Sequence, residues 1–169
     1  MRYRDTKPTY KKRYKSAALL ELEKLANAEA KRRHPGIDPR YIPPRTYFDN
    51  NANALTKSVM AWLSLNHHHA ERINTMGRPI DNRKIVTDVL GHKRQIGSVT
   101  WIKTAGQKGS SDISAVINGR AVRIEVKILD RQSQEQKEYQ RQVEAAGGTY
   151  IIVRSFQAFY DWYQQFATK

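Results

Sequence analysis

Asp112, Glu125 and Lys127 are the residues whose chemical types and spacing could carry out a reaction. They flank two short runs of alternating apolar residues that are separated by Asn118-Gly119. An Asn-Gly pair between two such runs is typical of a β-hairpin with a two-residue type I′ turn, in which both central residues have positive φ. Continued to the open end of the hairpin, that register places Asp112 opposite Glu125. Lys127 then projects from the same face as Glu125, because side chains alternate along a strand.

Two opposed carboxylates destabilise a hairpin, because directly paired side chains have Cβ atoms only about 4.5–5.5 Å apart. The pair is tolerated if one carboxylate is protonated or if a cation lies between the two; otherwise the register itself is wrong. One interpretation is a divalent-metal site with Lys127 as its polar partner, because carboxylate oxygens are preferred ligands of Mg²⁺ and Mn²⁺. The other interpretation is an exposed strand face that carries an ordinary Glu–Lys pair.

Asp112 followed by Glu125-Val126-Lys127 resembles the D…(D/E)-x-K signature of the PD-(D/E)XK nuclease superfamily. The surrounding segments resemble its VRR-NUC branch in order and spacing: Lys108-Gly109-Ser110-Ser111-Asp112, Ile124-Glu125-Val126-Lys127, Ser133-Gln134-Glu135-Gln136, Gly147-Gly148 and Val153-Arg154-Ser155. The similarity is close from Gly109 onwards, loose over residues 51–109, and absent over the first 48 residues. It implies an α/β (α+β) fold with a restriction-endonuclease-like αβββαβ core around a mixed central sheet, preceded by an N-terminal helical extension.

The same resemblance implies a Mg²⁺- or Mn²⁺-dependent endodeoxyribonuclease that hydrolyses phosphodiester bonds. Asp112, Glu125 and the Val126 carbonyl would be the metal ligands. Lys127 would orient the attacking water or stabilise charge that develops on the phosphate. The resemblance to this family further implies branched or junction-like DNA as the substrate and a homodimer as the active form.

Gln136 has two interpretations. The resemblance implies that its side chain reaches into the active site, whereas Ser133-x-x-Gln136 is also a capping box that would secure a helix N-terminus. The family often adds a glutamate from a helix that precedes the first strand. This chain has Asn51 and Asn53 there instead, which argues against a helix-borne carboxylate ligand.

The composition predicts a polyanionic partner. In 169 residues there are 30 Lys or Arg and 16 Asp or Glu, for a net charge of +14, and such a charge favours association with nucleic acid. No cysteine is present, which excludes zinc fingers of the thiolate type and disulfide frameworks. No apolar run approaches a signal peptide or a membrane span, so we expect a cytoplasmic protein with no membrane partner.

The predicted DNA contacts are basic residues in three parts of the chain. The first part is the N-terminal arm, the second is a basic, turn-rich insert between strands expected at residues 70–74 and 99–103, and the third is the approach to Asp112. Loops and inserts held by a rigid sheet commonly carry substrate contacts. The candidates are Lys12, Arg13, Arg83, Lys84, Lys93, Arg94, Lys103 and Lys108.

The sequence divides at residue 48. Residues 1–48 form a basic arm, a helix that begins after Ser16, and a Pro-rich linker; residues 49–169 form the nuclease-like domain. We expect the first helix to dock on the core or on a second subunit. Asp49 or Asn50 should cap a second helix. Residues 149–154 should form an interior strand, and an aromatic helix capped by Ser155 should complete the core.

Two other functions compete with a structure-specific nuclease. A non-catalytic DNA-binding protein would use the same positive charge without any metal. A sequence-specific restriction-type nuclease would use the basic insert to read base edges.

Overall fold

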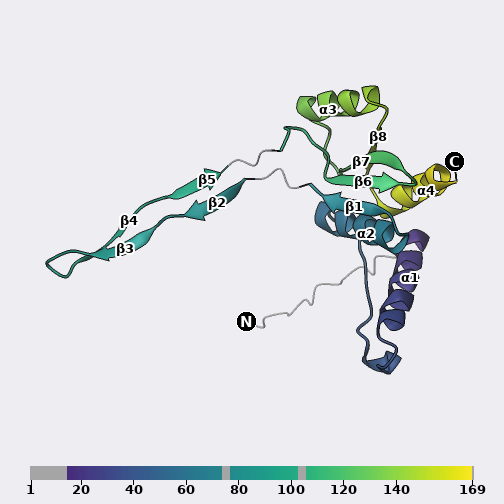
Figure 1. Cartoon of the computed structure of the whole chain (residues 1–169), viewed down its shortest axis with the longest axis horizontal. Helices are drawn as coiled ribbons and strands as arrows, with labels where there is room; N and C mark the ends of the chain where they lie inside the picture. The colour runs from purple at the N-terminus through teal and green to yellow at the C-terminus, as the bar shows by residue number, and fades with distance from the viewer. Residues whose placement is uncertain (1–14, 74–76, 103–105, 169) are drawn as a thin grey trace, which may run out of the picture.

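A four-stranded mixed sheet lies at the centre of the computed structural model, which describes residues 15–73, 77–102 and 106–168 (Figure 1). The strand order is β1-β6-β7-β8, with the bounds β1 His69–Arg72, β6 Ile113–Ile117, β7 Arg120–Val126 and β8 Thr149–Val153. The first three strands are antiparallel, and β8 is parallel to β7. The predicted mixed sheet and α+β class are confirmed.

The β6–β7 hairpin has the register that Asn118-Gly119 predicts. Ile117 pairs with Arg120, and Ile113 pairs with Ile124. Asn118 has φ 49° and Gly119 has φ 76°, as a type I′ turn requires. One face of this hairpin is apolar and fully buried, which fixes the register because a slip of one residue would turn that face to solvent.

Helices cover both faces of the sheet (Figure 1). The helices are α1 Ala17–Arg33, α2 Ala52–Leu65, α3 Gln134–Ala145 and α4 Phe156–Ala167, with a short 3₁₀ helix, η1, at Pro39–Tyr41. The core joins apolar residues of α1, α2 and α4 to the apolar face of the β6–β7 hairpin, and α3 lies over the opposite face. From α2 onwards the core elements follow in the order α2, β1, β6, β7, α3, β8, α4. No helix of the described segments is long and apolar enough to cross a bilayer.

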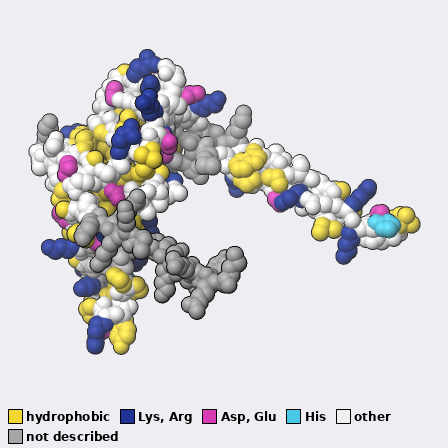
Figure 2. All heavy atoms as spheres, turned by 180° about the vertical axis from the view of Figure 1, so that it is seen from behind, with side chains coloured by type: hydrophobic (Ala, Val, Ile, Leu, Met, Phe, Trp, Pro, Cys, Tyr) yellow, Lys and Arg dark blue, Asp and Glu magenta, His cyan; other side chains and the backbone are white. Residues whose placement is uncertain are grey.

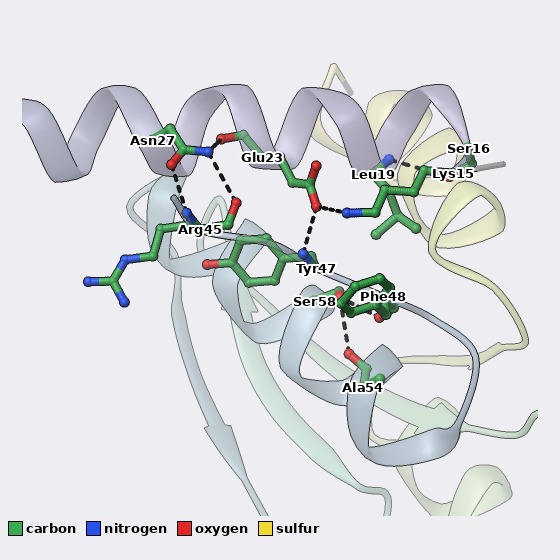
Figure 3. Close-up of polar contacts among 10 residues, drawn as sticks. All are labelled: Lys15, Ser16, Leu19, Glu23, Asn27, Arg45, Tyr47, Phe48, Ala54 and Ser58. Carbon is green, nitrogen blue, oxygen red and sulfur yellow. Dashed lines mark hydrogen bonds and ion pairs between the residues drawn. The ribbon is translucent and has the colours of Figure 1, made fainter. Parts of the chain in front are cut away.

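Helix α1 docks on α2 and α4 of the same chain. Ser16 caps it by accepting a hydrogen bond from the Leu19 amide, and Leu19 and Leu22 are at most 2% exposed. Further along, Glu23 accepts the Tyr47 amide at 2.7 Å and Asn27 accepts the Arg45 amide at 2.7 Å (Figure 3). These two side chains fix the end of the Pro-rich segment against α1.

The predicted cap of α2 is wrong by one or two residues. Asn51 is the N-cap, and its Oδ1 accepts the Ala54 amide at 2.9 Å. Asp49 instead accepts the amide of Phe156 at 3.0 Å, in the first turn of α4. A carboxylate is favourable there because the N-terminal amides of a helix carry partial positive charge, so Asp49 links the start of one helix to the start of another.

The predicted interior position of the strand at residues 149–154 is also wrong. β8 is an edge strand of the sheet, and Ile152 is 39% exposed. Tyr150 and Val153 are nevertheless buried. Residues 150–153 are apolar because helices cover both faces of β8, and not because β8 has a neighbouring strand on each side.

Residues 77–102 form a projecting β-ribbon, which we call the arm (Figure 1). It consists of two short antiparallel pairs: β2 Arg78–Asp81 with β5 Val99–Ile102, and β3 Lys84–Thr87 with β4 Lys93–Ile96. Gly97 lies between them with φ 87°, and a Cβ there would be 2.2 Å from the Asn82 carbonyl oxygen. Glycine is therefore required at the junction, because a side chain would force the two strands apart.

Candidate active site

The hairpin register brings the two predicted carboxylates together. Asp112 immediately precedes β6, and Glu125 is the penultimate residue of β7. Oδ2 of Asp112 accepts a hydrogen bond from the Val126 amide at 2.8 Å. This bond extends the β6–β7 pairing by one step and holds the Asp112 carboxylate against the end of β7.

Glu125 is a buried carboxylate that is satisfied on one oxygen only. Its exposed fraction is 2%. Oε1 accepts a hydrogen bond from Gln136 Nε2 at 2.5 Å and lies 3.1 Å from the Lys127 ammonium. Oε2 is buried and has no hydrogen-bond partner among the described residues. Buried polar atoms are rarely left unpaired, so this oxygen is available to a water molecule, an ion or a ligand.

The protonation of Glu125 reflects both burial and its neighbours. Burial raises the pKa of its carboxyl group, the nearby Asp112 carboxylate raises it further, and Lys127 and Gln136 oppose the shift. A group in this state gains most from a cation, because a cation offsets both the loss of hydration and the repulsion between the carboxylates.

The Gln136 side chain takes part in the capping box and also reaches Glu125. The side-chain oxygen Oε1 of Gln136 accepts a hydrogen bond from the Ser133 backbone amide at 3.0 Å. The backbone amide of Gln136 donates to Ser133 Oγ at 3.3 Å, which completes the capping box. Its side-chain NH₂ group remains available, and it is this group that donates to Glu125. The cap therefore orients the residue that contacts the carboxylate.

The Val126 carbonyl lies on the side of β7 that faces Asp112. The Lys127 amide donates to the Val153 carbonyl of β8 at 2.9 Å, whereas the Val126 amide donates to Asp112 on the other side. The N–H and C=O of one strand residue point to the same side. The carbonyl of Val126 is thus directed to the side of β7 on which Asp112 lies.

These groups fit a small divalent cation. In the described segments no cluster of three or more His, Cys, Asp or Glu residues is placed to hold a metal, and the predicted ligand set accordingly has only two carboxylates, with the Val126 carbonyl as its third group. Mg²⁺ commonly binds proteins through one or two carboxylates and retains several waters. Helix α2 adds no acid: Asn51 is the N-cap and Asn53 accepts the Arg72 guanidinium at 2.8 Å.

Tyr150 is a neighbour of the site that the sequence did not indicate. It pairs with Arg123 across β7 and β8, which places it on the same face of the sheet as Glu125. Its hydroxyl is buried without a hydrogen-bond partner in the described structure. Burial and the charge of Glu125 raise its pKa. The parallel register that brings Tyr150 here depends on the α3 crossover, for which the sequence has no local signal.

A cleft of about 640 Å³ opens beside Gln136 between the base of the arm and the first turn of α3. Trp101 and Ile102 line the arm side, and Lys108, Ser133 and Gln136 line the other. Trp101 is 62% exposed. An exposed indole, a cation and polar groups in one cleft suit a nucleotide, because bases stack on aromatic rings and phosphates bind cations.

The predicted DNA-contacting residues lie in different places. Lys108 lines the cleft. Arg83 is paired with Asp81 at 2.6 Å, while Lys84, Lys93 and Arg94 are exposed on the arm, away from the carboxylates. Lys12, Arg13 and Lys103 lie outside the described residues.

The sequence was compared with known proteins. No protein-family model matches it, and no curated protein matches it at a significant level. The resemblance to PD-(D/E)XK nucleases therefore depends on the residues named above and on their order.

Proposed function

We propose that this protein is a metal-dependent nuclease that hydrolyses phosphodiester bonds in DNA, of the PD-(D/E)XK and VRR-NUC type. The observation that carries the proposal is Glu125: a buried carboxylate beside Asp112, held on one oxygen by Lys127 and Gln136, with its other oxygen unpartnered among the described residues. The order α2, β1, β6, β7, α3, β8 supports it, because this is the αβββαβ order that the resemblance implies.

Each residue of the site has a role in this chemistry. Asp112, Glu125 and the Val126 carbonyl would hold Mg²⁺ or Mn²⁺. A bound ion of this kind polarises a phosphate and lowers the pKa of a water molecule, so that hydroxide is available near neutral pH. Lys127 carries its ammonium 3.1 Å from Glu125, where it stabilises negative charge that develops on the phosphate oxygens. Gln136 keeps the Glu125 carboxylate in one orientation.

The substrate follows from charge and from the resemblance. A net charge of +14 favours a polyanion through counterion release. Branched or junction-like DNA and a homodimer, in which two sites face opposite strands, are the substrate and assembly that the resemblance implies.

The test is cleavage of supercoiled, linear and four-way-junction DNA with Mg²⁺, with Mn²⁺ or with EDTA. The wild type should cleave with either metal and not with EDTA. Glu125→Gln should reduce the rate by about 100-fold or more, because it removes a metal ligand without changing the shape of the side chain. Glu138→Gln is the matched control: Glu138 lies on α3, exposed and paired with Arg141, and its loss should leave the rate unchanged. Wild-type cleavage by Glu125→Gln would overturn the proposal.

A second candidate is a non-catalytic DNA-binding protein, which the basic residues of the arm favour. It predicts salt-sensitive binding that does not change with Asp112→Asn, and no cleavage with any metal. Cleavage at a fixed site on linear DNA would instead identify the restriction-type nuclease.

A further inference from the structure

The arm exposes apolar side chains that nothing in the described chain covers. At its tip Val89 is 103% exposed and Leu90 is 78% exposed, and Ile85 on the adjoining strand is 73% exposed. Figure 2 shows hydrophobic and basic side chains interspersed along the arm to its end. Exposed apolar side chains that are gathered at one place, as Val89 and Leu90 are at the tip, commonly indicate an interaction site.

The tip is a closed turn that presents Val89 and Leu90 outward. Oδ1 of Asp88 accepts hydrogen bonds from the amides of Leu90 and His92, each at 2.9 Å. The Asp88 amide donates to the His92 carbonyl at 3.0 Å, and the Gly91 amide donates to the Asp88 carbonyl at 3.0 Å. Four hydrogen bonds therefore hold the turn in one shape, so little conformational entropy is lost when the two apolar side chains bind.

Both faces of the arm combine apolar and cationic side chains. Cross-strand partners share a face. One face carries the pairs Lys84–Ile96 and Val86–Arg94, and the other carries Ile85–Gln95 and Thr87–Lys93. A ribbon that binds a protein through one side would gather its apolar residues on that side. In β3 and β4 neither face has a continuous apolar surface, which argues against a second copy of this chain as the occupant of this outer part of the arm.

The charge of the arm fits a nucleic acid. Residues 77–102 contain five Lys or Arg and two Asp. Both aspartates are engaged within the arm, Asp81 by Arg83 and Asp88 by backbone amides. A two-stranded ribbon fits the major groove of duplex DNA, where the phosphates of both strands flank it within reach of long cationic side chains.

We propose that the arm is inserted into DNA, with the cations of its two faces along the phosphates of two strands and with Val89 and Leu90 as a wedge between unstacked bases. Apolar wedges of this kind open base steps and bend the duplex. The proposal deepens the proposed function and takes its ligand, DNA, from it. Its test does not require cleavage.

The test measures base unstacking with the full-length protein in EDTA. DNA duplexes and four-way junctions carry 2-aminopurine, which fluoresces more strongly when it is unstacked. The wild type should raise the fluorescence. Val89→Ser/Leu90→Ser should remove most of that rise and weaken binding roughly tenfold. Leu20→Ser is the matched control, because Leu20 is 54% exposed on α1.

The cations are tested in the same assay by the salt dependence of binding. Lys84→Gln/Lys93→Gln removes one cation from each face and should reduce the slope of log K against log salt by about 1.8. Lys24→Gln with Lys57→Gln, two exposed lysines of α1 and α2, is the control and should change the slope less.

The results separate the arm from the active site. Wild-type unstacking by Val89→Ser/Leu90→Ser would overturn the proposal, and so would arm variants that turn a dimer into a monomer in sedimentation while DNA binding is unchanged. Unstacking that depends on Val89 and Leu90 without metal-dependent cleavage would support the arm and overturn the proposed function. Metal-dependent cleavage without such unstacking would support the proposed function and overturn the proposal for the arm.

Discussion

Gln136 donates a hydrogen bond to Oε1 of Glu125 at 2.5 Å, and the carbonyl oxygen of the same side chain accepts the Ser133 amide at 3.0 Å. One amide therefore joins a helix cap to a buried carboxylate. The start of α3 and the end of β7 are held together at this point, and a change in either alters the orientation of Glu125.

Substitutions of Gln136 and of Ser133 should have different effects on cleavage and on stability. Gln136→Ala should reduce metal-dependent cleavage by about 10–100-fold, the usual effect of losing a residue that orients a metal ligand. Ser133→Ala removes the cap hydroxyl and should lower stability by about 1 kcal/mol while the contact with Glu125 remains. Chemical denaturation and initial cleavage rates measure the two effects. An equal loss of cleavage in both variants would mean that Gln136 acts only through the helix.

The stability of the metal-free protein should depend on the protonation of Glu125. Its pKa is raised in the folded state by burial and by Asp112. The folded protein therefore holds this proton more tightly than the unfolded chain does, and the stability that this provides is present at low pH and lost as the pH rises through the raised pKa. Thermal unfolding in EDTA should show this loss in the wild type and not in Glu125→Gln.

Mg²⁺ should restore stability mainly above that pKa, because metal binding requires the deprotonated carboxylate. Parallel pH profiles for wild type and Glu125→Gln, with and without Mg²⁺, would contradict this account of the site.

Gly109→Ala should displace residues of the site although Gly109 is not one of the proposed metal ligands. Gly109 has φ 76°, and a Cβ there would lie 2.5 Å from the backbone of Glu135 in the first turn of α3. The substitution must displace that turn, and Gln136 with it. We expect a stability loss of about 1–3 kcal/mol together with reduced cleavage. Gly147→Ala, at φ 79° with no atom within 4 Å, should lower stability by about 1 kcal/mol and leave cleavage intact.

Helix α1 should be required for the stability of the sheet. Leu22 is fully buried in the shared core, and Leu22→Ala should lower the free energy of unfolding by about 2–5 kcal/mol. Leu25 on the same helix is 39% exposed, and Leu25→Ala should lower it by less than about 1 kcal/mol. Urea titration of both variants measures the difference. A loss of less than about 1 kcal/mol for Leu22→Ala would show that α1 contributes little to the core.

The parts of the fold that local chemistry specifies were predictable from the sequence. The turn at Asn118-Gly119 sets the register of β6 and β7 through its own backbone preference, so the juxtaposition of Asp112 and Glu125 follows from the residue types and their spacing. The capping box at Ser133 likewise specifies the start of α3.

Relationships between distant segments were not predictable. Asp49 binds the amide of Phe156, and Tyr150 comes beside Glu125 through a parallel pairing. Parallel strands are joined by a crossover and not by a turn, so no short-range pattern records their register. The arm was expected as a basic, turn-rich insert, but its two antiparallel pairs and its exposed tip follow from strand contacts that the sequence leaves open.

Every side chain of β3 and β4 is exposed to solvent. Substitutions at exposed positions usually change stability little, so the fold itself tolerates changes at these eight residues. The geometry of the ribbon confers this freedom. If the arm binds DNA as proposed, a chain of this kind could change its preference among DNA structures through substitutions in β3 and β4 alone.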